Sequence, residues 1–276
     1  HFDLDPKIRF KKLLFDNGEY ELIECPDWAD PDPLNFKVGE KRFIDKYKAY
    51  QKKTGQQSAV LVAKGKVEGL KVIAFGYNFL HGGAAMTQRE NEHILVGIQT
   101  ALDEKYDAAI SFYQSGGMAV TGNLNSLTNM PVQMMAMKML KDAGIVTIGI
   151  LNSKTTGGTF CNVYGNDFLF AEHPKTENLL FAGKRVSASV NAGIEMPSDF
   201  GEGQSLVKNG MIDGTFSSRL EIKTKVVSLI NVLLKKVKQK SISSSLKLDD
   251  NNTIAVSVFL ISYGIIFYFN FKDRSS

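Results

Sequence analysis

Residues 108–117 read AAISFYQSGG, and residues 145–158 read IVTIGILNSKTTGG. In each stretch a run of apolar residues leads within a few positions to a Gly-Gly pair. Short apolar runs bounded by glycine are typical of buried strands. The sequence between the two runs has a helical pattern at 127–143, with Pro131 expected in the first turn, where proline is tolerated. This alternation of strand and helix predicts an α/β fold with largely buried strands.

The alternation continues outward in both directions along the chain. Further strands are predicted at 58–63 (SAVLVA), 71–75 (KVIAF) and 179–182. Apolar residues at helical spacing predict a helix at 91–102 between two of the strands. Other helices are predicted at 8–15, 43–53, 206–210 and 223–236, and Gly55 is expected to stop the second of these.

Composition and charge exclude several classes of protein. The chain has 276 residues, of which 43% are hydrophobic and 22% charged, so it is neither disordered nor collagen-like. Its net charge of +4 combines +6 from Arg219 onward with −2 from the first 218 residues, so we expect no nucleic-acid partner for the core. Cys25 and Cys161 are too few and too far apart for a zinc site, and a reducing compartment is expected.

The C-terminal tail differs from the rest of the chain. Residues 251–271 carry no charge, and they follow the basic run KKVKQK at 235–240. About 20 apolar residues can span a bilayer, so we expect a domain at 1–240 and a tail at 241–276 with a possible membrane contact through 251–271. The alternative is a hydrophobic segment that docks on the protein. The chain begins with His1 and not with Met, so we expect a segment before it.

Three Gly-Gly pairs are the main candidate site: Gly82-Gly83, Gly116-Gly117 and Gly157-Gly158. At a strand-to-helix junction such a pair leaves backbone N–H groups unshielded near the positive end of the helix dipole. These amides could bind a phosphate or a developing oxyanion. The alternative is a tight turn without a ligand. Neither GxGxxG nor GxxxxGK[ST] occurs around them, which disfavours dinucleotide-binding and P-loop interpretations.

Six segments in this order resemble the β subunit of the bacterial or plastid acetyl-CoA carboxylase carboxyltransferase, from about residue 1 to about residue 236. Ser115–Gly117 matches the start of the family's S-G-G-A-R-M-Q-E, and TTGG at 155–158 matches P-T-T-G-G-V. The other four are DKYKAYQKKTG at 45–55, FLHGGAAM at 79–86, FAGKRV at 181–186 and SLVKNGMID at 205–213.

The resemblance implies a crotonase-like (ClpP/crotonase) fold of stacked ββα units and a transferase of lipid metabolism. Such an enzyme moves a carboxyl group from carboxybiotin to acetyl-CoA and so makes malonyl-CoA for fatty acid biosynthesis. Biotin is carried on a separate biotin carboxyl carrier protein. Decarboxylation of carboxybiotin produces free biotin, which acts as the base. The implied partner is a carboxyltransferase α subunit in an α2β2 heterotetramer, and the implied compartment is the bacterial cytoplasm or the plastid stroma.

The resemblance also assigns roles to the glycine pairs. Gly116 and Gly117 would bind the thioester oxyanion, and Gly82 and Gly83 would line the same pocket. The substrate-binding residues would be Gly157 and Gly158, which shape the neighbouring wall, together with Lys184 and Arg185 near the CoA phosphates or the α subunit. From the residues alone, the alternative for these two cations is a solvated loop. No metal is implied for this sequence, because the family's four-cysteine zinc ribbon is absent.

Some residues depart from the family pattern. Two glycines of the family are replaced by Met86 and Glu90, and the arginine and glutamate after the second pair are missing from the stretch 118–122. These departures leave two alternatives open. One is a non-catalytic paralogue with a structural or interaction role, and the other is a carboxyltransferase or decarboxylase for another acyl-CoA.

Overall fold

A computed structural model describes residues 3–175, 177–190 and 197–244 of the chain. Contacts divide the chain into two compact units, His1–Val237 and Lys238–Ser276, and the fold described here is that of the first. The uncharged stretch 251–271, expected to contact a membrane, lies outside the described residues. Within the described ranges, every helix is too short or too polar to cross a membrane.

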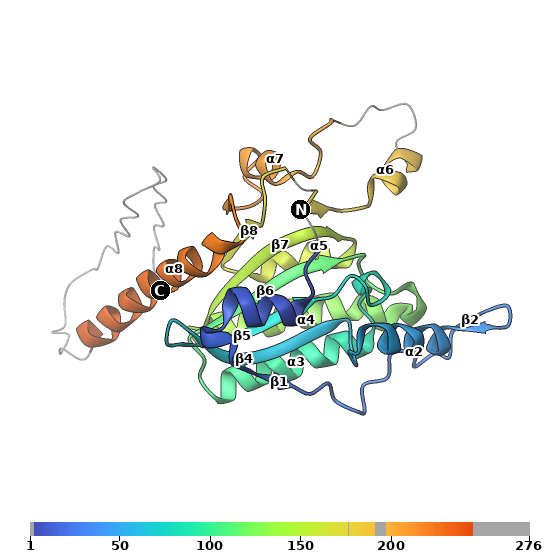
Figure 1. The fold of residues 1–276 in the computed structure, drawn as a ribbon, viewed down its shortest axis with the longest axis horizontal. Coiled ribbons are helices and arrows are strands. Elements are labelled where there is room, and N and C mark those ends of the chain that lie inside the picture. Colours follow the sequence, from blue (N-terminus) through green and yellow to red (C-terminus); the bar gives the residue numbers. More distant parts are fainter. Residues whose placement is uncertain (1–2, 176, 191–196, 245–276) are drawn as a thin grey trace, which may run out of the picture. The chain divides into compact units, whose positions relative to one another are not determined.

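A single sheet forms the centre of this unit (Figure 1). Its strand order is β1-β4-β5-β6-β7-β8-β10, with β9 paired to β7, and β5 to β8 run parallel to one another. The strands alternate with helices along the chain, which confirms the predicted α/β class. Their bounds are β1 Tyr20–Ile23, β4 Val60–Val67, β5 Leu70–Tyr77, β6 Ala108–Ser115, β7 Val146–Thr156, β8 Phe168–Ala171, β9 Leu179–Leu180 and β10 Gly214–Thr215.

Helices connect the strands, and a small hairpin of β2 (Lys37–Val38) and β3 (Lys41–Arg42) precedes α2. The antiparallel pair β4 and β5 with α3 forms a ββα unit, and β6 with α4 and β7 with α5 repeat the order of strand, then helix. The helices are α1 Pro6–Arg9, which continues as a π turn at Phe10–Leu14, α2 Phe43–Thr54, α3 Gln88–Asp103, α4 Leu124–Asp142, α5 Gly158–Asn162, α6 Lys184–Val190, α7 Gly203–Lys208 and α8 Leu220–Ser244.

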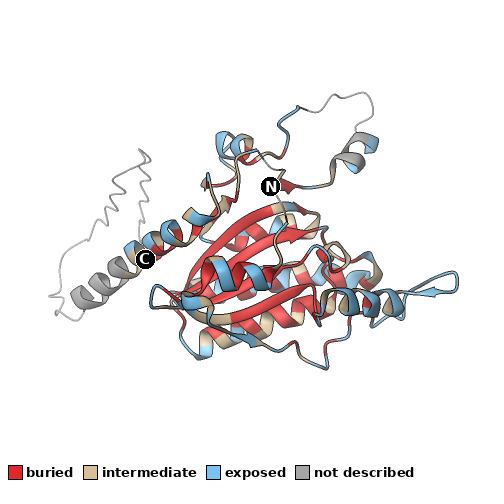
Figure 2. Ribbon diagram, in the orientation of Figure 1, coloured by how far each residue is buried: buried red, intermediate tan, exposed pale blue. Residues whose placement is uncertain are grey.

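The sheet buries both of its faces (Figure 2). Successive residues of a strand point to opposite faces, so neighbouring residues enter different clusters. Ile73 and Phe75 of β5 pack with Ile94 and Ile98 of α3 on one face. Residues of β5 to β7 on the other face pack with α8 and with the segment at Phe10–Leu14; they are Val72, Ala74, Ala108, Ile110, Phe112, Val146, Ile148 and Ile150. This burial of both faces explains the nearly continuous apolar runs of the sequence.

Local signals set the start of α3 and the end of α2, whereas α4 starts before its predicted position. Helix α3 begins at Gln88 because Thr87 and Glu90 form a capping box. The Thr87 hydroxyl accepts a hydrogen bond from the backbone N–H of Glu90, and the Glu90 carboxylate accepts one from the backbone N–H of Thr87. Helix α4 begins at Leu124, three residues before the predicted start. Pro131 therefore lies inside the helix, and its expected place in the first turn was wrong. Helix α2 ends as predicted at Gly55, which has a left-handed φ of 63°.

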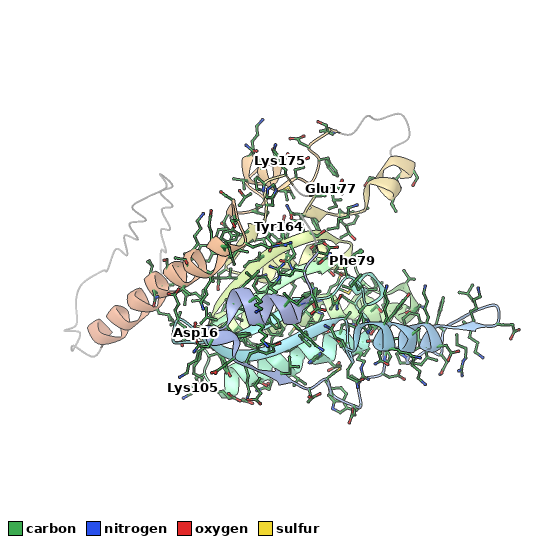
Figure 3. All side chains as sticks on the ribbon, in the orientation of Figure 1. Asp16, Phe79, Lys105, Tyr164, Lys175 and Glu177 are labelled. Atoms are coloured by element: carbon green, nitrogen blue, oxygen red, sulfur yellow. The ribbon has the colours of Figure 1, made fainter. Side chains whose placement is uncertain are left out.

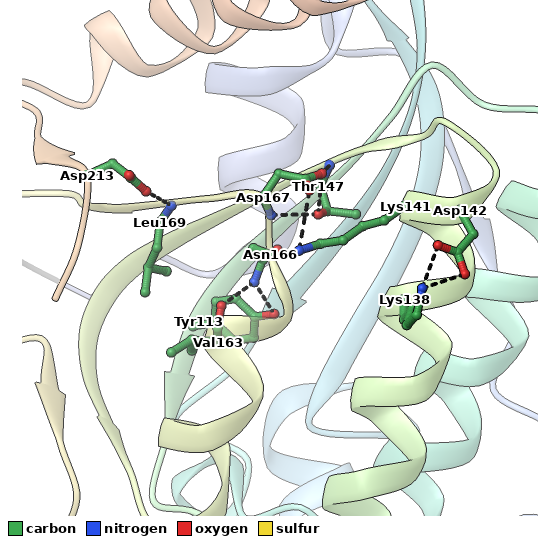
Figure 4. Close-up of polar contacts among 10 residues, drawn as sticks. All are labelled: Tyr113, Lys138, Lys141, Asp142, Thr147, Val163, Asn166, Asp167, Leu169 and Asp213. Carbon is green, nitrogen blue, oxygen red and sulfur yellow. Dashed lines mark hydrogen bonds and ion pairs between the residues drawn. The ribbon is translucent and has the colours of Figure 1, made fainter. Parts of the chain in front are cut away.

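The connection between β7 and β8 is fixed by polar contacts (Figure 4). The carboxylate of Asp167 accepts hydrogen bonds from both the N–H and the hydroxyl of Thr147, each at 2.8 Å. The amide of Asn166 donates to the Tyr113 hydroxyl at 3.0 Å, and Asp213 accepts from the Leu169 N–H at 2.7 Å. Strand β8 has only four residues and was not predicted from the sequence; these contacts add to its parallel pairing with β7.

A buried ion cluster ties the N-terminal helix to the end of the sheet. Glu172, which has no exposed surface, pairs with Arg9 at 2.5 Å and with Arg219 at 3.0 Å. Arg9 is itself buried, and its guanidinium carbon lies 4.9 Å from the centre of the Phe112 ring. These contacts hold α1, the end of β8 and the start of α8 together.

Candidate functional site

The three glycine pairs lie beyond the C-terminal ends of three neighbouring parallel strands. Gly116-Gly117 follows β6 directly, and Gly157-Gly158 follows β7 directly. Gly82-Gly83 comes after β5 and four further residues. Because β5, β6 and β7 are hydrogen-bonded neighbours, the pairs share one edge of the sheet.

Backbone contacts join the first pair to the second. The N–H of Gly116 donates to the carbonyl of Gly83 at 2.8 Å. The N–H of Met86 donates to the carbonyl of Gly117 at 2.9 Å, and the N–H of Ala119 donates to the carbonyl of Met86 at 2.8 Å. Three backbone hydrogen bonds therefore join the loop after β5 to the loop after β6.

The second pair lies directly against the third. A Cβ on Gly117 would lie 3.0 Å from the carbonyl oxygen of Thr156 and 3.1 Å from the Cα of Gly157. Gly117 also has a φ of 102°, which side chains rarely allow. Only glycine lets the two loops approach this closely, so the structure brings together all six glycines that the sequence singled out.

Most of the amides in these pairs already have internal acceptors. The N–H of Gly83 donates to Phe79, that of Gly116 to Gly83, and that of Gly157 to Phe181 at 3.0 Å. The N–H of Gly117 donates to the hydroxyl of Ser115, also at 3.0 Å. By contrast, no described residue accepts a hydrogen bond from the amides of Gly82, Met118 or Gly158. The amide of Met118 was not singled out from the sequence, because nothing in the motif marks it.

Two of the glycine pairs lie several residues before the helix that follows them. Gly158 is the first residue of α5, a helix of five residues. Helices α3 and α4 begin only at Gln88 and Leu124, well after Gly83 and Gly117. The expected position of these two pairs at the positive end of a helix dipole is therefore wrong. The capping box fixes the start of α3, and a 3-10 turn at Val120–Gly122 precedes α4.

Residues that depart from the family pattern have visible structural roles. Met86 is fully buried in the core. Glu90 is also fully buried, and it accepts hydrogen bonds from the Tyr47 hydroxyl at 2.5 Å and from the Ala59 N–H at 2.9 Å. Neither residue adds bulk to the glycine loops. Met118 does, because a Cβ on Gly158 would lie 2.5 Å from its Cγ.

Two titratable side chains lie next to the first glycine pair: Tyr50, whose ring lies against Gly82, and His81. The His81 side chain is buried and lies against the ring of Tyr47, with 5.0 Å between centroids. Burial lowers the pKa of His81, so the ring is neutral at pH 7. Its Nε2 has no hydrogen-bond partner among the described residues. The position is that of a packed histidine beside the first pair.

Exposed apolar side chains surround the pairs. Phe79, labelled in Figure 3, would be the nearest neighbour of a Cβ on Gly83, at 3.9 Å. Phe79, Leu80, Val120 and Phe181 all have large exposed fractions, and Val120 is 85% exposed. The backbone carbonyl of Phe181 accepts a hydrogen bond from the Gly157 N–H, so the segment that leads into α6 borders the third pair. Lys184 and Arg185 begin α6, but the structure does not describe their side chains.

Comparison with known proteins gives a consistent picture. Residues 31–256 match the model of the carboxyl transferase domain. The chain is 33% identical over 236 residues to the acetyl-coenzyme A carboxylase carboxyl transferase subunit beta of Brucella ovis, covering 85% of this chain and 77% of that one. The protein of the same name from Chelativorans sp. is 34% identical, over 85% of this chain and 74% of that one.

Solved structures share the fold. Transcarboxylase 12S superposes with a TM-score of 0.62 at 18% identity, over 81% of this chain and 40% of that one. The chain thus spans about two fifths of the transcarboxylase chain. A Pseudomonas malonate decarboxylase hetero-tetramer superposes with a TM-score of 0.60 at 14% identity, over 90% of both chains. Together with the domain match, these likenesses confirm the expected fold.

Proposed function

The chain belongs to the carboxyl transferase domain family, and from this premise we propose that it transfers a carboxyl group from carboxybiotin to acetyl-CoA, giving malonyl-CoA. It would act as the β-type subunit of an acetyl-CoA carboxylase, as the names of its bacterial relatives suggest. The observation that carries the proposal is the meeting of three glycine pairs at the ends of three parallel strands.

The backbone fits the binding of a thioester. A Cβ on Gly116 would meet only the carbonyl of Gly83 within 4 Å, at 3.3 Å, and a Cβ on Gly83 would meet only Phe79. These faces leave room for a flat group to approach the main chain. We propose that the amides of Met118 and Gly158, which no described residue accepts, donate to the thioester oxygen as it gains negative charge. One such donor typically contributes about 10²–10³ in rate.

The chain contributes little acid–base chemistry of its own. Around the second and third pairs, the described side chains in contact with the glycines are methionine, and the nearby polar groups are hydroxyls of serine and threonine. When bound, biotin supplies the carboxyl group and a basic ring nitrogen. The loops of this chain would orient acetyl-CoA, stabilise its enolate oxygen and hold the methyl carbon near the donor.

We assign the remaining contacts as follows. Gly82 and Gly83 line the pocket, and Gly157 and Gly158 form its neighbouring wall. Lys184 and Arg185 bind the CoA phosphates or the partner subunit. An alanine substitution of both cations should raise the KM for acetyl-CoA more than it lowers kcat, because contacts remote from the reacting atoms mainly serve binding.

The proposed partners are a carboxyltransferase α subunit, in an α2β2 heterotetramer, and a biotin carboxyl carrier protein. The exposed apolar residues around the pairs support a covering subunit, since exposed patches of this kind mark interaction sites. The bacterial sources of the relatives support a cytoplasmic location, and the plastid stroma is the second compartment that the family resemblance allows.

A reconstitution tests the proposal. The chain is mixed with an α subunit, a carboxylated biotin carrier and acetyl-CoA, and malonyl-CoA is measured by mass spectrometry. We expect malonyl-CoA well above the level seen without the chain. If the complex is shown to assemble and still yields only background malonyl-CoA, the proposal is wrong. Propionyl-CoA and malonyl-CoA, offered in parallel, test for a different acyl-CoA carboxyltransferase or a decarboxylase.

One observation favours a second candidate, a structural subunit with the same fold. The amides of Gly116 and Gly117, which the family resemblance assigns to the oxyanion, are both bonded within the protein. A structural subunit should not bind acetyl-CoA. Equilibrium dialysis that finds acetyl-CoA bound at micromolar concentration would exclude this second candidate.

A further inference from the structure

The hydroxyl of Ser115 lies where the three glycine-bearing loops meet. Ser115 is the last residue of β6 and has no exposed surface. Its Oγ donates to the carbonyl of Ala84 at 2.7 Å and accepts from the N–H of Gly117 at 3.0 Å. It also accepts from the hydroxyl of Thr159 at 3.0 Å. A serine hydroxyl has one proton and two lone pairs, so its bonding capacity is fully used.

Each partner of this hydroxyl belongs to a different loop. Ala84 follows the first glycine pair, Gly117 is part of the second, and Thr159 follows the third. One oxygen atom therefore links the ends of β5, β6 and β7. Thr156 adds a longer contact, from its hydroxyl to the carbonyl of Ser115 at 3.4 Å.

The loop after β5 needs such a link. Gly82, Gly83 and Ala84 have φ values of 62°, 74° and 48°, so three successive residues are left-handed. This conformation is unfavourable for Ala84, which carries a Cβ. Tertiary bonds must therefore hold the loop in shape, and Ser115 supplies one of them directly at Ala84.

We propose that Ser115 is a positioning residue that sets the spacing of the three glycine loops for carboxyl transfer. The inference rests on the proposed function for its catalytic consequence, but the positioning itself can be measured without turnover. Because Ser115 has no exposed surface and its hydroxyl is fully bonded, it would not contact the substrate. It acts through the backbone, whose amides and open glycine faces would contact the thioester.

The first test measures carboxyl transfer in the assembled complex. Ser115→Ala removes one atom and leaves three buried polar groups without their partner. We expect kcat to fall by about 10–100-fold while the KM for acetyl-CoA changes little, because misplaced groups cost rate more than binding. Ser115→Cys, which keeps a weak donor and acceptor, should recover part of kcat. Thr159→Val breaks one of the three bonds and should have a smaller effect.

Ser126→Ala is the matched control. Ser126 is also buried, but its hydroxyl has no partner among the described residues. Ser126→Ala also removes a buried hydroxyl oxygen, but no hydrogen bond is lost with it, so kcat should stay at the wild-type value.

The second test measures hydrogen exchange of the Gly117 amide by NMR. Without its acceptor, this amide should exchange at least about tenfold faster in Ser115→Ala than in the wild type. Its exchange rate should be unchanged in Ser126→Ala. An inactive wild-type complex would refute the proposed function, and the exchange rates would still decide whether Ser115 holds the loops. Wild-type kcat in an active Ser115→Ala complex, or unchanged Gly117 exchange, would overturn the inference.

Discussion

Replacing Gly117 by alanine tests how closely the second and third glycine loops must approach. The new Cβ would lie 3.0 Å from the carbonyl oxygen of Thr156 and 3.1 Å from the Cα of Gly157. Both atoms belong to the backbone, so no side chain can rotate away and the loops must separate by a few tenths of an ångström. Gly144→Ala is the matched control, since Gly144 also has a positive φ, of 76°, but nothing lies within 4 Å of a Cβ there.

The two variants should differ by the cost of the clash alone. A left-handed φ costs an alanine about 1–2 kcal/mol, and this applies to both positions. Overpacking adds about 1–3 kcal/mol at Gly117. We therefore expect the free energy of unfolding to fall by about 1–2 kcal/mol in Gly144→Ala and by about 2–5 kcal/mol in Gly117→Ala.

The activity of the two variants should diverge further. A displacement of about 1 Å near reacting groups can cost about 100-fold in rate, so a shift of tenths of an ångström should cost roughly tenfold. Urea denaturation followed by circular dichroism gives the stability, and malonyl-CoA formation gives the rate. If both variants lose the same stability, or if Gly117→Ala keeps the wild-type kcat, the close approach of the loops has no energetic or functional weight.

Three further predictions follow from buried groups. Glu172→Gln should lower the free energy of unfolding by about 3–5 kcal/mol, measured in urea, because Arg9 is left buried without a counter-charge. Burial lowers the pKa of His93 below the unfolded value near 6.5, so its contribution to stability is complete above pH 6.5 and is lost as the pH falls below it. His93→Gln should flatten this dependence in melting curves recorded between pH 7 and pH 5. Iodoacetamide at pH 8 should modify the exposed Cys161 well before Cys25, since burial raises the pKa of the Cys25 thiol to about 11.

Each of these three has an outcome that would contradict it. A Glu172→Gln protein as stable as the wild type would mean that the ion cluster contributes nothing net. A His93→Gln protein with the same pH dependence of stability as the wild type would show that His93 titrates normally in the folded state, since the buried His81 also contributes to that dependence. Peptide mapping that finds Cys25 and Cys161 labelled at the same rate would show that Cys25 is accessible.

The sequence predicts the elements of this fold where one signal dominates. The strands at 108–112 and 145–151 are apolar runs buried on both faces, and the structure extends them to Ser115 and Thr156. The helix at 43–53 ends at Gly55 because glycine takes the left-handed cap. Strand β8 and helix α5 were not predicted, since four or five residues carry too little periodicity.

For the site, the sequence predicts which glycines matter but not how their amides are used. The pairs stand out because they follow strands that pack side by side. Whether the N–H of Gly117 faces a ligand or the Ser115 hydroxyl depends on a rotamer and on loops that are distant in sequence. The same holds for Met118, whose side chain covers Gly158 from another loop. The contact between Met118 and Gly158 joins two loops and arises only from the tertiary structure.

The pairing of Arg9 with Glu172 has a consequence for how the chain is made. The two residues are 163 positions apart, so α1 leaves the ribosome long before Glu172, which directly follows β8, has been added to the chain. At about 5–20 residues per second, synthesis of that interval takes roughly 10–30 s. During this time Arg9 lacks its carboxylate partner. The ion pair that ties α1 to the end of the sheet therefore cannot form until most of this folded unit has been made.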